Sequence, residues 1–288
     1  MPVFSLITAT VGRVDELYRL IDTLAGQTCS DFEWIIVDQN PDGRLLSVVE
    51  YATAKGIVTQ HLRSSRRGLS LARNIGLKHC QGNIVAFPDD DCWYEPDTLI
   101  QVHQQFQLKK KLAGIVARWH EQDPADLPSV TLNWQQWRRF RGITASSITI
   151  FLDKALVDQV GGFDEALGVP LWFSGGEETD LMFRVLASSR QVITCPNIIV
   201  HHPVTTGETM LTTAESFRRA RHRSRGTGAL YAKHNLAAWV ILRGLLSPLW
   251  NISPPFSKQR LAWQLGMWLG RAEGYLSWHC GRILRRRP

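Results

Sequence analysis

The chain lacks several features that mark specialised protein classes. It has only five cysteines in 288 residues, with no CxxC pair and no zinc-finger spacing of Cys and His, which argues against a disulfide framework or a structural zinc site and fits a reducing compartment. Its amino-terminal residues lack the charged start and apolar run of a signal peptide, so we expect a cytosolic protein. The most apolar late segment, Ala237 to Trp250, is interrupted by Arg243 and Pro248 and is shorter than the roughly 20 residues that span a bilayer.

Charge is neither abundant nor evenly distributed. Hydrophobic residues make up 44% of the chain and charged residues 20%, which is the composition of a globular protein with one large or two modest domains. The net charge is +7, yet residues from 201 onward hold 14 basic and 3 acidic side chains, against 19 and 23 before them. The sequence therefore predicts a slightly acidic front and a strongly basic tail.

The first ninety residues alternate strand-like and helix-like patterns. Strands are predicted over Val3–Thr8, Phe32–Val37, Ile57–Leu62 and Asn83–Phe87, with helical patterns between them. Such alternation is typical of β-α-β units and a mainly parallel sheet, which binds ligands at the carboxyl ends of its strands. The polar residues past those ends are the first candidates for a site: Thr8–Thr10, Asp38–Asp42 and Asp89–Asp91.

The pattern becomes mixed after the fourth strand. Helices are predicted over Asp97–Leu108 and Glu177–Ser188, and strands over Gly114–Arg118, Ser146–Leu152, Gln191–Thr194 and Ile198–Val200. Beyond His202 the sequence predicts only loops and helices.

Three adjacent carboxylates, Asp89-Asp90-Asp91, directly follow the fourth predicted strand. They repel one another unless a positive charge lies between them, and Mg²⁺ or Mn²⁺ commonly takes one or two carboxylates together with substrate phosphates. In an extended segment Asp89 and Asp91 point the same way and could face a metal together. A solvated acidic turn is the alternative, but the position at a strand end favours a metal site.

Several segments, in order, carry a resemblance to a known family. They are Ser5-Leu-Ile-Thr8-Ala-Thr10, Phe32-Glu-Trp-Ile-Ile-Val-Asp38, Gly68-Leu-Ser-Leu-Ala-Arg73-Asn-Ile-Gly76, the aspartate triplet, Gly161-Gly-Phe-Asp164-Glu165, and Gly176-Glu177-Glu178-Thr-Asp180. Together they resemble the family 2 glycosyltransferases, inverting enzymes with the nucleotide-binding, Rossmann-like GT-A fold. The resemblance covers roughly residues 3 to 235.

The resemblance implies roles for the strand-end residues. Thr8, Thr10 and Asp38 would line the base and ribose pocket, with Arg73 beside them, while Asp89 would bind nucleotide and metal and Asp91 the metal. A carboxylate at a strand end can accept from a base N–H or ribose hydroxyl, and an arginine offers a fork of donors. The alternative for Asp38 is that it only shapes the turn that follows.

The resemblance also implies a catalytic base on the acceptor side. An inverting transferase needs one group to remove the proton of the attacking hydroxyl. The family usually has Glu-Asp where this chain has Glu177-Glu178, so we favour Glu178 as the base and keep Glu177 as the alternative. Asp164 would hold the acceptor loop, although a simple turn is the competing interpretation.

Other candidates are a histidine pair and two tryptophans. His201-His202 follows a short predicted strand where the family often carries a histidine, and we name His201 as a metal ligand with His202 left open. Imidazole suits Mn²⁺ better than Mg²⁺. Trp134 and Trp172 could contact sugar in the acceptor cleft, with burial in the core as the alternative.

The basic tail combines arginine with tryptophan. Five Arg lie within residues 218–225, and five of the eleven Trp lie between positions 239 and 278 on an amphipathic pattern. This composition is typical of a helix in a membrane interface. The alternative is that the apolar stripe packs on the catalytic domain or forms a dimer.

These observations predict an α/β protein with the GT-A fold and a basic helical carboxyl-terminal extension. We expect a glycosyltransferase domain over 1–210, with a nucleotide-binding half at 1–95 and an acceptor-binding half at 96–210, and a basic amphipathic region at 211–288. The expected activity is metal-dependent (Mn²⁺ or Mg²⁺), inverting transfer from a nucleotide-sugar donor, a UDP-sugar by preference, to a glycan or lipid-linked glycan.

The expected location is the cytoplasmic face of an anionic membrane, with no nucleic-acid partner and with homo-oligomerisation left open. Two other functions compete. A sugar-nucleotide nucleotidyltransferase is disfavoured because the loop after the first strand has a single glycine, Gly12. A non-catalytic polyanion- or membrane-binding protein with a degenerate GT-A domain is disfavoured by the intact aspartate triplet and glutamate pair.

Overall fold

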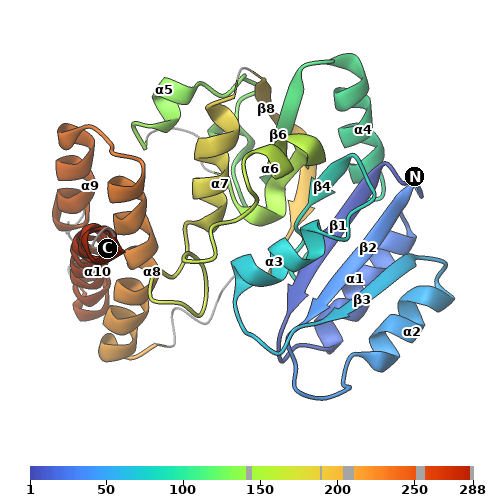
Figure 1. The fold of residues 1–288 in the computed structure, drawn as a ribbon, viewed down its shortest axis with the longest axis horizontal. Helices are drawn as coiled ribbons and strands as arrows, with labels where there is room; N and C mark the ends of the chain where they lie inside the picture. Colours follow the sequence, from blue (N-terminus) through green and yellow to red (C-terminus); the bar gives the residue numbers. More distant parts are fainter. Residues whose placement is uncertain (141–144, 189, 204–210, 251–256, 286–288) are drawn as a thin grey trace. The chain divides into compact units, whose positions relative to one another are not determined.

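The computed structural model describes residues 1–140, 145–188, 190–203, 211–250 and 257–285 (Figure 1). The chain folds as two compact units. The first takes in Met1–Trp134, Ile143–Phe163 and Arg184–Val204, and the second Gln135–Gly142, Asp164–Phe183 and Thr205–Pro288.

The first unit is built on one eight-stranded sheet with the order β3-β2-β1-β4-β7-β6-β8-β5. Its β1, β2, β3 and β4 are mutually parallel, β6 and β8 are parallel, β7 runs antiparallel to β4 and β6, and β5 runs antiparallel to β8. The strands are β1 Phe4–Thr10, β2 Phe32–Asp38, β3 Val58–Arg63, β4 Ile84–Ala86, β5 Trp93–Tyr94, β6 Leu112–Trp119, β7 Ile150–Asp153 and β8 Gln191–His201. The predicted mainly parallel α/β fold is confirmed.

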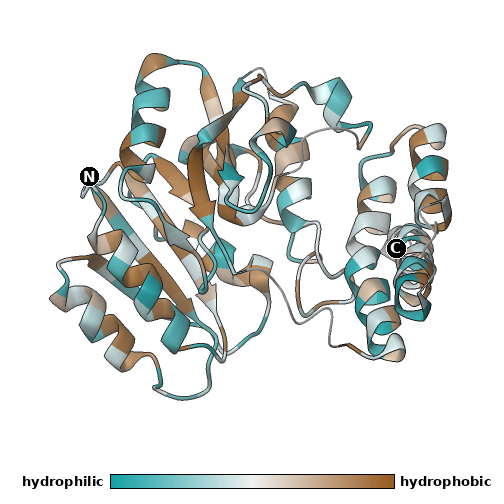
Figure 2. Ribbon diagram, turned by 180° about the vertical axis from the view of Figure 1, so that it is seen from behind, coloured by the Kyte–Doolittle hydropathy of each residue, from teal (hydrophilic) through white to brown (hydrophobic). Residues whose placement is uncertain are grey.

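Helices cover the sheet because their apolar residues recur on one side. In α1 the residues Leu17, Leu20, Ile21 and Leu24 are all buried, as the periodicity predicts. Figure 2 shows the hydrophobic strands at the centre of this unit. The helices of this unit are α1 Asp15–Ala25, α2 Leu46–Ala54, α3 Leu69–Leu77, α4 Thr98–Leu108 and α6 Lys154–Gln159, with short 3₁₀ turns at Pro124–Asp126 and Ser147–Thr149. Most residues of α5 Trp134–Trp137 and α7 Glu177–Leu186 belong to the second unit.

Several elements differ from the sequence prediction, among them the short helices α5 and α6, which were not predicted. The two short strands predicted at Gln191–Thr194 and Ile198–Val200 are one strand, β8, whose pairing with β6 shifts register between Ala117 and Arg118. The strand predicted from Ser146 begins with a 3₁₀ turn, and β7 starts only at Ile150. The two-residue strand β5 was not predicted, because a hydrophobic period cannot be read from two residues.

The second unit is mainly helical. It contains α8 Thr213–Lys233, α9 Ala238–Trp250 and α10 Lys258–Arg285 (Figure 1), and Thr212 with Glu215 forms a reciprocal capping box at the start of α8. These helices confirm the predicted helical carboxyl-terminal extension. Among the residues that the structure describes, no helix combines the length and the apolar character needed to cross a membrane.

Candidate functional site

The carboxyl ends of β1, β2 and β4 lie side by side in the first unit. Thr10 at the end of β1 pairs in register with Asp38 at the end of β2, and β4 neighbours β1 on its other edge. The aspartate triplet follows β4 after Phe87-Pro88. Parallel topology therefore brings the predicted strand-end candidates to one edge of the sheet.

A basic side chain lies between two of the three aspartates. Arg13 Nη1 is 2.5 Å from Asp90 Oδ1 and 2.6 Å from Asp91 Oδ2, and Thr10 Oγ1 donates to Asp90 Oδ2 at 2.7 Å. Arg13 was not among the residues predicted from the sequence. Its position could have pointed to the site, because Arg13 lies three residues after the end of β1. Gly12 just before it has a φ of 84°, a conformation that favours glycine and turns the chain.

The same contacts shift the acidity of these groups in opposite directions. Burial raises the pKa of Asp90, although the Thr10 hydrogen bond and Arg13 oppose the shift. Burial also acts to raise the pKa of Asp91, but His202 and Arg13 outweigh it and the net shift is downward. The pKa of His202 is raised by its contact with Asp91. Asp91 is thus held as a carboxylate beside a histidine.

Asp91 and His202 have the chemistry of a metal-binding pair. His202 Nε2 is 3.1 Å from Asp91 Oδ1, and that buried oxygen accepts no well-aligned hydrogen bond from any residue that the structure describes. Within the described ranges no group of three or more His, Cys, Asp or Glu side chains is arranged as a metal site. A carboxylate and an imidazole suit a divalent cation whose other positions are filled by phosphate and water, so the residues fit an incomplete metal site.

His201, the histidine favoured from the sequence, is placed differently. Its Nε2 lies 2.6 Å from Glu95 Oε1, and its ring stacks on His120 with centroids 4.4 Å apart and on Trp93 at 5.1 Å. Alternation along β8 explains the difference, since neighbouring residues in a strand point to opposite faces. The structure therefore places His202, not His201, at the aspartate triplet.

Arg73 lies beside the first aspartate of the triplet. It sits on α3 with 1% of its surface exposed, and its Nη2 lies 3.1 Å from Asp89 Oδ1 and 2.8 Å from Ser147 Oγ. Its guanidinium also lies 5.3 Å from the centre of the Phe163 ring. A buried guanidinium held on several sides is a rigid support for Asp89.

The two remaining nucleotide-site candidates make internal hydrogen bonds. Thr8 Oγ1 accepts from the Trp34 indole at 2.9 Å, and both residues are fully buried. Asp38 Oδ1 accepts from the backbone and side-chain nitrogens of Asn40, each at 2.8 Å, while Oδ2 is 3.1 Å from His61 Nε2. Both side chains therefore shape the end of the sheet through these hydrogen bonds.

In the second unit, the predicted base lies at the start of α7. Glu177 is buried with 5% exposure, whereas Glu178 is partly exposed, and Thr179 Oγ1 donates to Glu178 Oε1 at 3.2 Å. The preceding Gly175 and Gly176 have φ of 81° and 84°, a conformation that favours glycine. Local backbone geometry thus explains the glycines before the glutamate pair.

The acceptor-side candidates have partners of their own. Asp164 Oδ2 lies 2.5 Å from Lys233 Nζ, and its Oδ1 caps the following turn by accepting from the Ala166 backbone at 2.9 Å. Trp172 is 51% exposed, with the Arg225 guanidinium 3.6 Å from its ring centre. Trp134, which belongs to the first unit, is partly buried at the start of α5.

Comparison with known proteins identifies the family. Residues 5–152, just over half of the chain, match the family described as Glycosyl transferase family 2. The chain belongs to this family. Poly(ribitol-phosphate) beta-N-acetylglucosaminyltransferase TarS of Staphylococcus aureus is 29% identical over 140 residues, which are 45% of this chain and 24% of TarS. A PGL/p-HBAD biosynthesis glycosyltransferase of Mycobacterium bovis is 33% identical over 103 residues, 35% of this chain and 40% of that protein. The matches thus span less than half of either relative's length.

Solved structures share the fold of this family 2 protein. Mannosyltransferase PcManGT from Pyrobaculum calidifontis, in complex with GDP-Man and Mn²⁺, has a TM-score of 0.65 at 16% identity, covering 96% of this chain and 87% of that one. S. aureus TarS 1–349 in complex with UDP-GlcNAc has a TM-score of 0.62 at 16% identity, covering 98% and 92%. These likenesses confirm the predicted GT-A-like fold.

Proposed function

We propose that this family 2 protein is a metal-dependent inverting glycosyltransferase. It moves a sugar from a nucleotide-diphosphate donor, a UDP-sugar by preference, to a hydroxyl of a glycan or lipid-linked glycan in surface polysaccharide synthesis. The observation that carries the proposal is the cluster at the ends of β1 and β4, where Thr10, Arg13 and Arg73 hold the aspartate triplet. Structural relatives with a nucleotide sugar bound support the donor class.

The metal would be held in the first unit by Asp91 and His202, with Asp89 beside them. The buried Oδ1 of Asp91, 3.1 Å from His202 Nε2 and without a well-aligned donor among the described residues, supports this assignment. A bound Mn²⁺ or Mg²⁺ supplies positive charge that stabilises the departing nucleoside diphosphate. Arg73 keeps Asp89 in place through its contact at 3.1 Å.

Glu178 is the proposed base. It accepts the proton of the acceptor hydroxyl while the new bond from that oxygen to the anomeric carbon forms and the bond from the anomeric carbon to the diphosphate breaks, with inversion. Its partial exposure supports this role, because a base has to reach a hydroxyl that arrives from solution, whereas Glu177 is buried. Asp164, Trp134 and Trp172 remain the proposed acceptor contacts.

The second unit is proposed to bind the anionic inner face of the cytoplasmic membrane. An apolar groove of about 740 Å³ lies between the first turns of α8 and α10, lined by Ala214, Phe217, Leu261, Ala262 and Leu265 and flanked by the exposed bases Arg218 and Lys258. Large apolar side chains are exposed along α9 and α10: Trp239, Leu242, Trp250, Leu261, Leu265, Trp268 and Leu276. Apolar side chains beside positive charge suit acyl chains and anionic headgroups together.

Sugar transfer is tested with a panel of nucleotide sugars and glycan acceptors, with Mn²⁺, Mg²⁺ or EDTA present. The expected result is transfer that EDTA abolishes and that Asp91→Ala and Glu178→Gln each reduce by a hundredfold or more. The control Asp22→Asn, in an exposed ion pair with Lys55, is expected to leave transfer unchanged. Full transfer by both Asp91→Ala and Glu178→Gln would show that the mechanism is wrong.

Membrane binding is tested by sedimentation with vesicles of phosphatidylglycerol or of phosphatidylcholine alone. Binding to the anionic vesicles is expected to fall in the variant Arg218→Gln/Lys258→Gln and in Trp250→Ser/Trp268→Ser. The matched control replaces the basic run 109–111 of the first unit with Gln and is expected to bind as the natural chain does. Equal binding to both kinds of vesicle would contradict the proposal.

A further inference from the structure

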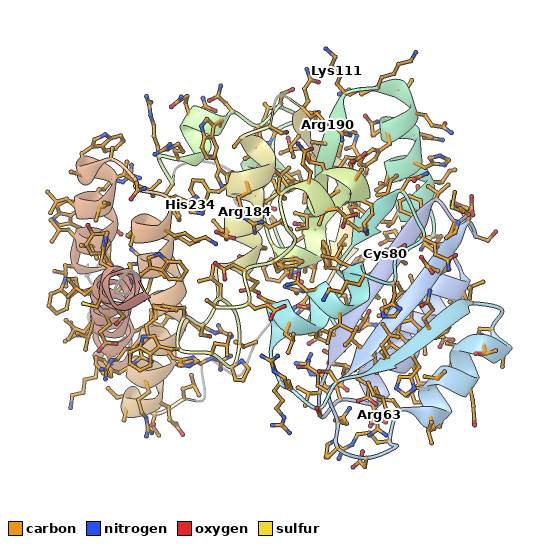
Figure 3. All side chains as sticks on the ribbon, in the orientation of Figure 1. Arg63, Cys80, Lys111, Arg184, Arg190 and His234 are labelled. Atoms are coloured by element: carbon orange, nitrogen blue, oxygen red, sulfur yellow. The ribbon has the colours of Figure 1, made fainter. Side chains whose placement is uncertain are left out.

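A fully buried carboxylate lies two residues after the proposed base. Asp180 on α7 has no exposed surface, and its Oδ1 is 2.6 Å from Lys233 Nζ and 2.8 Å from His234 Nε2. Both partners come from the carboxyl end of α8, where Figure 3 labels His234. A charge removed from water needs such partners, so this contact joins α7 firmly to the end of α8.

Lys233 reaches a second carboxylate with the same nitrogen. Its Nζ is 2.5 Å from Asp164 Oδ2, and its side chain is only 18% exposed. Asp164 belongs to the Gly161-Gly-Phe-Asp164 segment, and Asp180 to the segment that carries Glu177 and Glu178. One ammonium group thus joins the two acceptor-side segments, which lie sixteen residues apart in the chain.

Packing brings the loop before the base against the same helix. The Phe183 ring stacks on His234 with centroids 4.2 Å apart. A Cβ on Gly226 of α8 would stand 1.9 Å from the Gly175 carbonyl oxygen, and one on Gly176 would meet Leu230 at 3.0 Å. The backbone that leads into Glu177 therefore lies directly on α8, and its position follows that of the helix.

We infer that Lys233 is a positioning residue for sugar transfer. It sets the place of the proposed base, Glu178, by tying Asp180 and Asp164 to the end of α8, and it does not touch the reacting atoms. The contacts of Lys233 with Asp180 and Asp164 hold the first turn of α7 from two sides. Displacing a catalytic base by about 1 Å can lower the rate of reaction by two orders of magnitude. The inference rests on the proposed function for its activity test.

The test compares Lys233→Met, Lys233→Arg and the double variant Lys233→Met/Asp180→Asn with the natural chain. Lys233→Met is expected to lower kcat about 10- to 100-fold with KM for the donor unchanged. Lys233→Arg keeps the charge and is expected to recover most of the rate. In Lys233→Met the buried Asp180 carboxylate loses its ammonium partner and keeps His234. The double variant removes that carboxylate charge as well, so it tests the inference even if the single variant does not fold. The matched control is Lys55→Met, which breaks an exposed pair with Asp22.

The outcomes separate this inference from the proposed function. A folded Lys233→Met or double variant with the natural kcat would overturn the inference while sugar transfer stands. If the natural chain transfers no sugar, the proposed function fails. Hydrogen exchange then tests whether Lys233 holds the segment around Glu178 in place. Amides of residues 174–180 are expected to exchange faster in the double variant, with β1 and β2 unchanged, and equal exchange would overturn it.

Discussion

Gly270 of α10 lies against the backbone carbonyl of Arg221 in α8. A Cβ built on this glycine would stand 2.1 Å from that oxygen, and one on Gly274, one turn later, would stand 2.0 Å from the Arg225 carbonyl. At these two positions the backbones are so close that no side chain fits between the helices. It also explains how Glu273 reaches both arginines across the helix pair.

Replacing Gly270 with alanine is therefore expected to destabilise the second unit. The methyl group would force α8 and α10 apart at a cost of about 1–3 kcal/mol. Gly281→Ala is the matched control, because apart from the adjoining backbone of its own helix no atom of the described residues lies within 4 Å of its Cβ position, and alanine favours a helix. Urea unfolding followed by circular dichroism measures both. Equal midpoints for Gly270→Ala and the natural chain would contradict the packing.

The contact between α8 and α10 is expected to weaken in acid. Hydrogen bonds from Arg221 lower the pKa of Glu273, burial opposes this shift, and Arg225 adds to the lowering. Because the folded pKa lies below the ordinary value of 4.5, the stabilisation is present above pH 4.5 and is lost as the pH falls through the folded pKa. Thermal unfolding between pH 3 and pH 7 measures this effect.

The variant Glu273→Gln isolates the contribution of this carboxylate. It is expected to be less stable than the natural chain at pH 7 and to lose less stability on acidification below pH 4.5. Glu50→Gln, at an exposed position of α2, is the control and should keep the natural pH profile. A Glu273→Gln profile parallel to the natural one would show that other carboxylates dominate.

Thr8 is expected to matter for stability through one hydrogen bond. Thr8→Val keeps the shape but removes the oxygen that accepts from the buried Trp34 indole, which leaves an unpaired donor at a cost of about 1–3 kcal/mol. Thr8→Ser keeps the acceptor and is expected to lose less. Chemical unfolding of the two variants separates the hydrogen bond from the packing of the methyl group, and equal losses would contradict the assignment.

The sequence alone predicts the first half of the fold well, because periodicity and strand-end chemistry are local there. The predicted bounds of β1 and β2 differ from the observed ones by no more than two residues at either end. The order of the motifs along the chain is also sufficient to identify the family. The pattern cannot predict toward which face of the sheet a side chain points where a strand ends at a site. His201 and His202 at the end of β8 are the example, because only His202 contacts the aspartate triplet.

The sequence also could not predict which residues far apart in the chain form ion pairs. Arg13 lies 77 residues before Asp90, and Lys233 lies 69 residues after Asp164, so no spacing rule connects them. The triplet was expected to need a positive charge, and the structure places Arg13 there. The choice between a side chain and an ion as the source of that charge depends on tertiary structure, which a single sequence does not contain.

Arg13 is expected to compete with a metal for the aspartate triplet. Its guanidinium lies 2.5 Å from Asp90 and 2.6 Å from Asp91, so a cation that binds Asp91 has to displace or share this contact. Arg13→Gln is therefore expected to lower the melting temperature without metal and to increase the thermal shift caused by Mn²⁺ alone. Arg44→Gln removes a comparable arginine from its exposed pair with Asp42 and should show the natural shift. Asp91→Asn should show almost no shift, and a shift in Arg13→Gln no larger than that of the natural chain would mean that Arg13 and the metal do not share the site.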